Sequence, residues 1–85
     1  MYSMGNYFLE ILIEPIPGDG WTGAARFSRR DDYKQHADVP KAVFPSHIVR
    51  PTKGSAEAAI ADWARGLVET SADVVEASLR IAGEA

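Results

Sequence analysis

The chain of 85 residues contains no cysteine, which excludes disulfides, thiolate metal sites and cysteine nucleophiles. It also lacks a long hydrophobic run, because Glu10 interrupts the apolar residues near the start and Glu14 closes them. A membrane-spanning helix needs about 20 mainly apolar residues, and a secretory signal needs an unbroken apolar stretch. We therefore expect a cytoplasmic protein without a membrane segment, held together by packing alone.

A strong charge of one sign is missing as well. The net charge is −3, with 46% hydrophobic and 25% charged residues, which is typical of an ordinary globular domain. The distribution is uneven, because residues 26–53 hold seven basic and three acidic side chains while the remainder is acidic. A charged loop between two core-forming halves is the simpler interpretation, and a nucleic-acid contact is the alternative.

No catalytic, metal or cofactor motif is recognisable. Gly18, Gly20 and Gly23 begin a G-x-G-x-x-G pattern, but position 26 is arginine and the segment joins two expected strands. No serine stands in a G-x-S-x-G elbow. His36 and His47 lack the spacing of a metal site, and solvated histidines are the better interpretation. We expect no enzyme activity, no cofactor and no small-molecule ligand.

Two segments alternate between apolar and polar residues as strands do, namely residues 7–14 and 21–28. Between them, Pro17-Gly18 suits a type II turn, so the pair is expected to form a hairpin. If its apolar residues share one face, the paired residue numbers must add to an even number. The register that pairs Ile11 with Ala25 also sets Glu10 opposite Arg26 as an exposed ion pair.

A helix is predicted from residue 53 to about residue 69, with Thr52 or Ser55 capping its start. Its apolar stripe consists of Ala56, Ala59, Ile60, Trp63, Ala64, Leu67 and Val68. Gly23 and Ala25 leave a shallow groove on the second strand, and we expect Trp63 to pack into it. Residues 42–50 predict a short third strand, which Pro45 confines to a sheet edge.

These elements predict an α+β fold, with an antiparallel sheet of two to three strands in ββ(β)α order and one face covered by the amphipathic helix. Residues 1–6 are interpreted as a disordered leader, residues 7–70 as the single domain, and residues 71–85 as a tail. In the tail, Asp73-Val74-Val75-Glu76 has the form of a capping box, so a second C-terminal helix is one alternative. A continuous helix is the other.

Several of these residues together resemble a family of small uncharacterised bacterial proteins, often proteobacterial, with a ββ(β)α arrangement. The resemblance covers residues 7–68 and lies in a W-x-A-x-[VF]-like strand followed by a T-x-x-E-A helix start and a W-A-R segment. In this chain it rests on Trp21, Gly23, Ala25, Phe44-Pro45, Thr52, residues 56–59 and residues 63–65. The family implies a fold and no activity. Gly54 and Ser55 depart from its charged helix start, as does the extended tail after Thr70.

The absence of a reactive constellation favours a non-catalytic interaction module that contacts a protein partner or a second copy of itself. Leftover apolar side chains are the candidate interface: Phe8 and Leu12 on the sheet face away from the helix, and Val75 and Leu79 on the tail. The alternative is RNA binding through the segment 26–53, with contacts from Arg26, Arg29, Arg30, Lys34 and Lys41.

Overall fold

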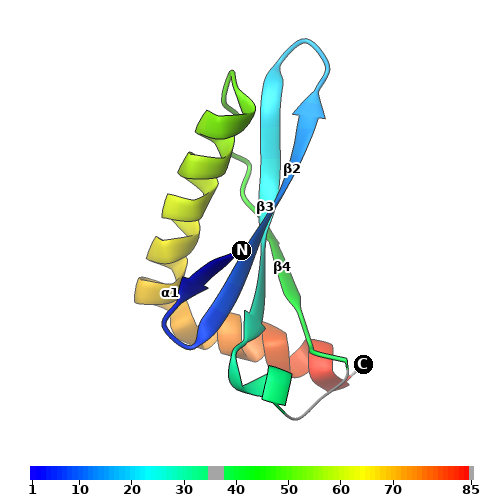
Figure 1. Ribbon diagram of the computed structural model, residues 1–85, viewed down its shortest axis with the longest axis vertical. Helices are drawn as coiled ribbons and strands as arrows, with labels where there is room; N and C mark the ends of the chain where they lie inside the picture. The colour runs from blue at the N-terminus through cyan, green and yellow to red at the C-terminus, as the bar shows by residue number, and fades with distance from the viewer. Residues whose placement is uncertain (35–37, 85) are drawn as a thin grey trace.

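The computed structural model describes residues 1–34 and 38–84 and contains a four-stranded antiparallel sheet and one long helix (Figure 1). In chain order the elements are β1 (Tyr2–Met4), β2 (Tyr7–Ile16), β3 (Gly20–Arg29), the 3-10 helix η1 (Asp31–Lys34), β4 (Ala42–Pro45) and α1 (Lys53–Glu84). The strands lie in the order β1-β2-β3-β4, so each pairs with its neighbour in sequence. The fold is α+β as predicted, but the sheet has four strands rather than two to three.

The β2–β3 hairpin has the predicted register. Ile11 pairs with Ala25 and Glu10 with Arg26, and the ladder runs from Tyr7 opposite Arg29 to Ile16 opposite Gly20. At the tip, the Asp19 amide donates to the Ile16 carbonyl at 2.9 Å and Gly18 has a φ of 82°. This geometry is that of a type II turn over Pro17-Gly18.

The prediction of a disordered leader over residues 1–6 is wrong for β1. Tyr2 pairs with Leu9 and Met4 with Tyr7, and a two-residue loop of Gly5 and Asn6 joins the strands. Gly5 has a φ of 59°, in the left-handed region that glycine adopts without steric cost in a two-residue hairpin loop. Met4 is 7% exposed and belongs to the core, because the hairpin turns its side chain onto the covered face of the sheet.

The predicted edge strand also forms. β4 pairs with β3 alone, with Phe44 opposite Ala25 and Ala42 opposite Phe27. Beyond Pro45 the chain returns to β3 at Arg50, whose backbone exchanges hydrogen bonds of 2.8 and 3.0 Å with Trp21. The charged loop contains η1, whereas His36 lies outside the described residues.

Helix α1 begins after a reciprocal cap in which both predicted residues take part. The Ser55 amide donates to Thr52 Oγ1 at 3.1 Å, and the Thr52 amide donates to Ser55 Oγ at 3.3 Å. The predicted stripe faces the sheet: Ala56, Ile60 and Ala64 are fully buried. Ala59, Trp63, Leu67 and Val68 are half-buried, while Glu57, Asp62, Arg65 and Glu69 are exposed.

The helix does not continue straight to its end. Ser71 has φ −141° and ψ 40°, so α1 consists of two helical halves joined by a kink (Figure 1). The first half lies along the sheet, and the second half, orange to red in Figure 1, turns in a different direction. Each of the two alternatives for the tail is therefore correct in part: the helix continues to Glu84, and it changes direction at Ser71, two residues before the predicted start of a second helix at Asp73. Val75 and Leu79 are 0% exposed and share one core with Met4, Leu9 and Phe27. Residues 71–84 therefore belong to the domain and are not a separate tail.

The groove over Gly23 is filled by Ile60 rather than by Trp63. A Cβ added to Gly23 would stand 3.1 Å from Ile60 Cδ1 and 3.1 Å from Ile13 Cδ1, and it would clash with the Leu12 carbonyl oxygen. Trp63 is half-buried and packs at the margin of the core. The reason is size. The space between Gly23 and the helix is wide enough for the terminal methyl group of Ile60, but an indole ring is too large for it.

Candidate functional site: the open face of the sheet

Alternation along the strands gives the sheet two faces, and α1 covers one of them. The covered face presents Tyr7, Leu9, Ala25, Phe27 and Ala42, each no more than 6% exposed. The opposite face, which we call the open face, consists of Phe8, Glu10, Leu12 and Glu14 on β2, Thr22, Ala24, Arg26 and Ser28 on β3, and Val43 and Pro45 on β4. No helix or strand lies over the middle of this face in the part of the chain that the structure describes.

The middle of the open face exposes apolar side chains. Leu12 is 38% and Val43 52% exposed, although both are large and hydrophobic. Between β2, β3 and the segment after β4 the face is hollowed to about 420 Å³, with Leu12, Thr22, Ala24, Pro45 and His47 in the lining. The hollow exists because Ala24, opposite Leu12 in the ladder, provides little side chain on this face.

One ion pair crosses the open face beside this hollow. Arg26 Nη2 donates to Glu10 Oε2 at 2.6 Å, and the two side chains are 32% and 31% exposed. Arg26 Nε is buried against the sheet and has no hydrogen-bond partner among the described residues. Arg26 and Glu10 therefore lie flat on the face and are joined by a single charged hydrogen bond.

Aromatic and cationic groups meet at the end of the open face near η1. The Phe8 ring lies edge to face against Tyr33 with centroids 5.3 Å apart, and the Arg30 guanidinium carbon is 5.4 Å from the Phe8 centroid. The Tyr33 hydroxyl is 3.0 Å from Ser28 Oγ, which is why Ser28 is buried here. A second hollow of about 460 Å³ adjoins these residues and is also lined by Asn6 and Lys34.

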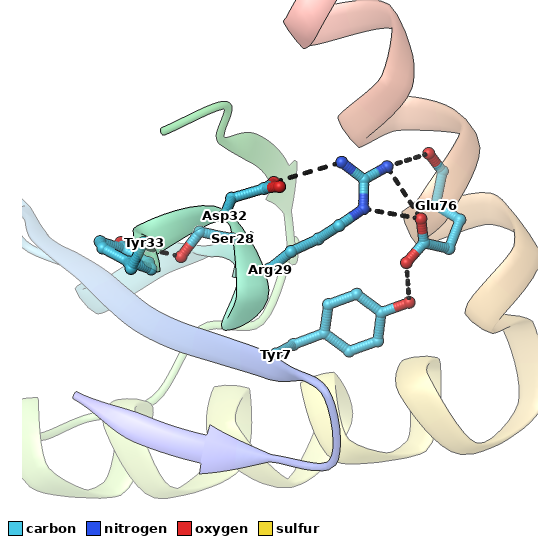
Figure 2. Close-up of polar contacts among 6 residues, drawn as sticks. All are labelled: Tyr7, Ser28, Arg29, Asp32, Tyr33 and Glu76. Carbon is cyan, nitrogen blue, oxygen red and sulfur yellow. Dashed lines mark hydrogen bonds and ion pairs between the residues drawn. The ribbon is translucent and has the colours of Figure 1, made fainter. Parts of the chain in front are cut away.

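A polar cluster on the covered side fastens the second half of α1 to the sheet (Figure 2). Glu76 accepts from the Tyr7 hydroxyl at 2.6 Å and from Arg29 Nε at 2.8 Å, and Arg29 Nη1 reaches Asp32 at 3.3 Å. Tyr7 and Arg29 are opposite each other in the ladder, so both project from the same end of the covered face. The cluster joins four elements, β2, β3, η1 and α1, and has the character of a structural clamp.

The clamp shifts the protonation of its members in a consistent direction. The Arg29 hydrogen bond, assisted by the Tyr7 hydroxyl, holds the pKa of Glu76 below its usual value. Burial, together with the hydrogen bond to Glu76, raises the pKa of Tyr7 to about 12. Both shifts favour a neutral tyrosine bonded to a charged carboxylate.

The structure separates the five predicted nucleic-acid contacts. Arg26 pairs with Glu10, Arg29 with Glu76 and Asp32, and Lys34 Nζ lies 3.9 Å from Asp31. Arg29 is on the covered side, away from Arg26 and Arg30. Lys41 is exposed beside β4. Of the five, Arg30 and Lys34 alone line the hollow beside Phe8, so the segment does not form one basic stripe.

The four predicted interface residues also divide. Phe8 and Leu12 lie on the open face, as their alternation predicts, although Phe8 is half-buried under Tyr33 and Arg30. Val75 and Leu79 are buried in the core, which corrects their assignment to a free patch. Val43 was missed, since a four-residue edge strand gives too short an alternation to show its outward side.

Three comparisons with known proteins add no relatives. No family model, no curated protein sequence and no solved structure matches the chain. Within residues 1–34 and 38–84 no helix is long and apolar enough to cross a membrane. In the same residues, no three histidine, aspartate or glutamate side chains are grouped to hold a metal ion.

Proposed function

We propose that this chain is a non-catalytic interaction module and that the open face is its protein-binding surface. The observation that carries the proposal is the exposure of Leu12 and Val43 beside a hollow, in the middle of a sheet face over which none of the described helices or strands lies. Antiparallel sheets can leave one face in water, but such a face is then polar. Here Leu12 and Val43 are exposed beside the Glu10–Arg26 ion pair, and exposed apolar side chains next to a hollow are typical of a contact surface.

The chemistry of the open face suits recognition rather than catalysis. Glu10 and Arg26 neutralise each other, and the other polar groups of the face and its hollow are the hydroxyls of Thr22 and Ser28, the exposed carboxylate of Glu14 and the exposed imidazole of His47. A protein partner would bury the apolar residues and meet the ion pair with a polar group of its own, as interface centres and rims commonly do.

A pair of variants with a matched control tests this proposal. Leu12→Lys and Val43→Glu place a charge on the open face, and Ile81→Lys does so at a 65% exposed apolar position on α1. We expect the first two to weaken association by about tenfold or more and the control to leave it unchanged. Association is measured by light scattering for self-contact and by capture from source cells for other proteins. If Leu12→Lys and Val43→Glu associate as strongly as the Ile81→Lys control and the parent chain, the proposal is refuted.

A second candidate is single-stranded nucleic acid, favoured by the contact of Arg30 with Phe8 and of Phe8 with Tyr33 beside the second hollow. Aromatic rings and guanidinium planes stack on unpaired bases. A labelled oligonucleotide titration at low salt would show an affinity that falls steeply with added salt and is reduced by Arg30→Ala. Absence of binding at low salt removes this candidate.

A further inference from the structure

The open face has a pattern that is complementary to itself. In consecutive cross-strand rows, Glu10 lies opposite Arg26 and Leu12 lies opposite Ala24. β2 therefore carries an acid and a large apolar residue, and β3 carries a base and a small residue in the same rows. Exchange of the two strands turns each row into its complement.

A two-fold axis performs this exchange when it runs parallel to the strands between β2 and β3, in the plane of contact. β2 of one copy then faces β3 of the other, as an isologous interface requires. Glu10 meets Arg26 of the second copy, and Leu12 meets Ala24 of the second copy. Two sheets in aligned face-to-face packing lie about 10 Å apart, a distance at which such side chains interdigitate.

We infer that the chain forms a two-fold symmetric dimer through its open face, in which Leu12 enters the hollow beside Ala24 of the second copy. The inference rests on the proposed function and names the partner as a second copy. The hollow of about 420 Å³ adjoins Leu12 and Ala24, so it lies where the arrangement needs it. Thr22, Ala24 and Pro45 form a small and partly apolar part of the lining, which also includes Glu14 and His47. The arrangement places the leucine side chain against this small part.

The ion pair supports the same arrangement. In the single chain one hydrogen bond of 2.6 Å joins Arg26 to Glu10. An arginine can donate in two directions and a carboxylate can accept at both oxygens, so both groups have capacity for a further bond. In the dimer two arginines and two glutamates alternate around the axis, and each charge has two opposite neighbours.

Two charge-reversed variants test this geometry, first each alone and then mixed with each other. Glu10→Arg leaves a face with two bases and Arg26→Glu leaves a face with two acids. Each variant alone should therefore associate about tenfold or more weakly than the parent, because like charges meet in the homodimer. An equimolar mixture should form heterodimers, identified by native mass spectrometry from the different masses of the two chains. Circular dichroism confirms that each variant is folded.

The outcomes separate the dimer from the broader proposal. Heterodimers in the mixture, with weak self-association of each variant, support the two-fold arrangement. If Leu12→Lys abolishes association but the mixture forms no heterodimer, the open face remains a binding surface and this arrangement is wrong. A parent chain that stays monomeric at millimolar concentration overturns the inference, and association that nuclease treatment abolishes assigns the face to nucleic acid instead.

Discussion

The two faces of the sheet are built from the same strands and have opposite roles. On β2, Leu9 and Leu12 are three residues apart, yet Leu9 is 0% and Leu12 38% exposed. The covered face is closed by a helix capped at Thr52 and clamped at Glu76, whereas the open face holds an ion pair and a hollow. Because alternate residues of a strand point to opposite faces, one set of side chains packs in the core and stabilises the fold, while the other set remains available for contacts.

The largest expected contrast comes from leucines on the same strand. Leu9→Ala opens a cavity in the core and should lower the free energy of unfolding by about 2–5 kcal/mol. Leu12→Ala removes a side chain that is already partly in water and should cost less than about 1 kcal/mol in the monomer. Urea denaturation at low protein concentration measures both. Equal midpoints would mean that the two faces do not differ in this way.

A smaller contrast concerns two glycines. Gly23→Ala inserts a methyl group against Ile60, Ile13 and the β2 backbone and should destabilise by about 1–3 kcal/mol. Gly66→Ala places the same group where nothing lies within 4 Å, in the first half of α1, and should stabilise by about 0.4–1 kcal/mol. The sign of the difference is measured by thermal unfolding. A stabilising Gly23→Ala would contradict the close approach of helix and sheet.

The clamp on the covered side predicts a stability that depends on alkaline pH. The pKa of Tyr7 is raised from 10.0 to about 12, so the unfolded chain loses this proton first. The contribution of Tyr7 is then complete below pH 10 and is lost as the pH rises towards 12. Tyr7→Phe should remove this part of the decline and cost about 0.5–1.5 kcal/mol at neutral pH, because the hydrogen bond to Glu76 is lost.

Denaturation series of the parent and of Tyr7→Phe between pH 8 and pH 12 make this comparison. Tyr33→Phe is the matched control, since the Tyr33 hydroxyl contacts Ser28 and not a carboxylate. If the free energy of unfolding falls with pH equally in the parent and in Tyr7→Phe, the clamp does not raise the pKa of Tyr7.

The smallest effect is expected on the outer side of α1, which belongs to neither face. Arg65 Nη1 is 3.3 Å from Asp62, and both side chains are exposed. Pairs of this kind contribute little, so Arg65→Ala should change the free energy of unfolding by no more than about 0.5 kcal/mol. A larger loss in urea denaturation would indicate that this surface packs against something in the folded chain.

Local patterns in the sequence predicted the hairpin, its register and the buried side of the helix. The even-sum register gave Ile11 opposite Ala25 and Glu10 opposite Arg26, and the helical period gave the stripe from Ala56 to Val68. Both follow from periodicities that a single element carries by itself. The turn at Pro17-Gly18 is local in the same sense.

The missed features depend on short or distant signals. β1 has three residues, too few for an alternation, although Gly5-Asn6 between Met4 and Tyr7 was a usable hairpin signal. Val75 is buried because the helix kinks at Ser71. The sequence around Ser71 contains no proline or glycine that would have predicted this kink. The contact of Arg29 with Glu76 joins residues 47 positions apart and could not be read from spacing. For the same reason, the basic residues of segment 26–53 are close together in the sequence but lie on different sides of the folded chain.

Amide nuclear magnetic resonance spectra over a dilution series test whether the open face is the contact surface. Between micromolar and millimolar protein, we expect concentration-dependent shifts for residues 10–12, 24–26 and 43, and constant signals for the first half of α1. Shifts that gather instead on the exposed side of α1, or signals that do not change over the whole range, would contradict this expectation.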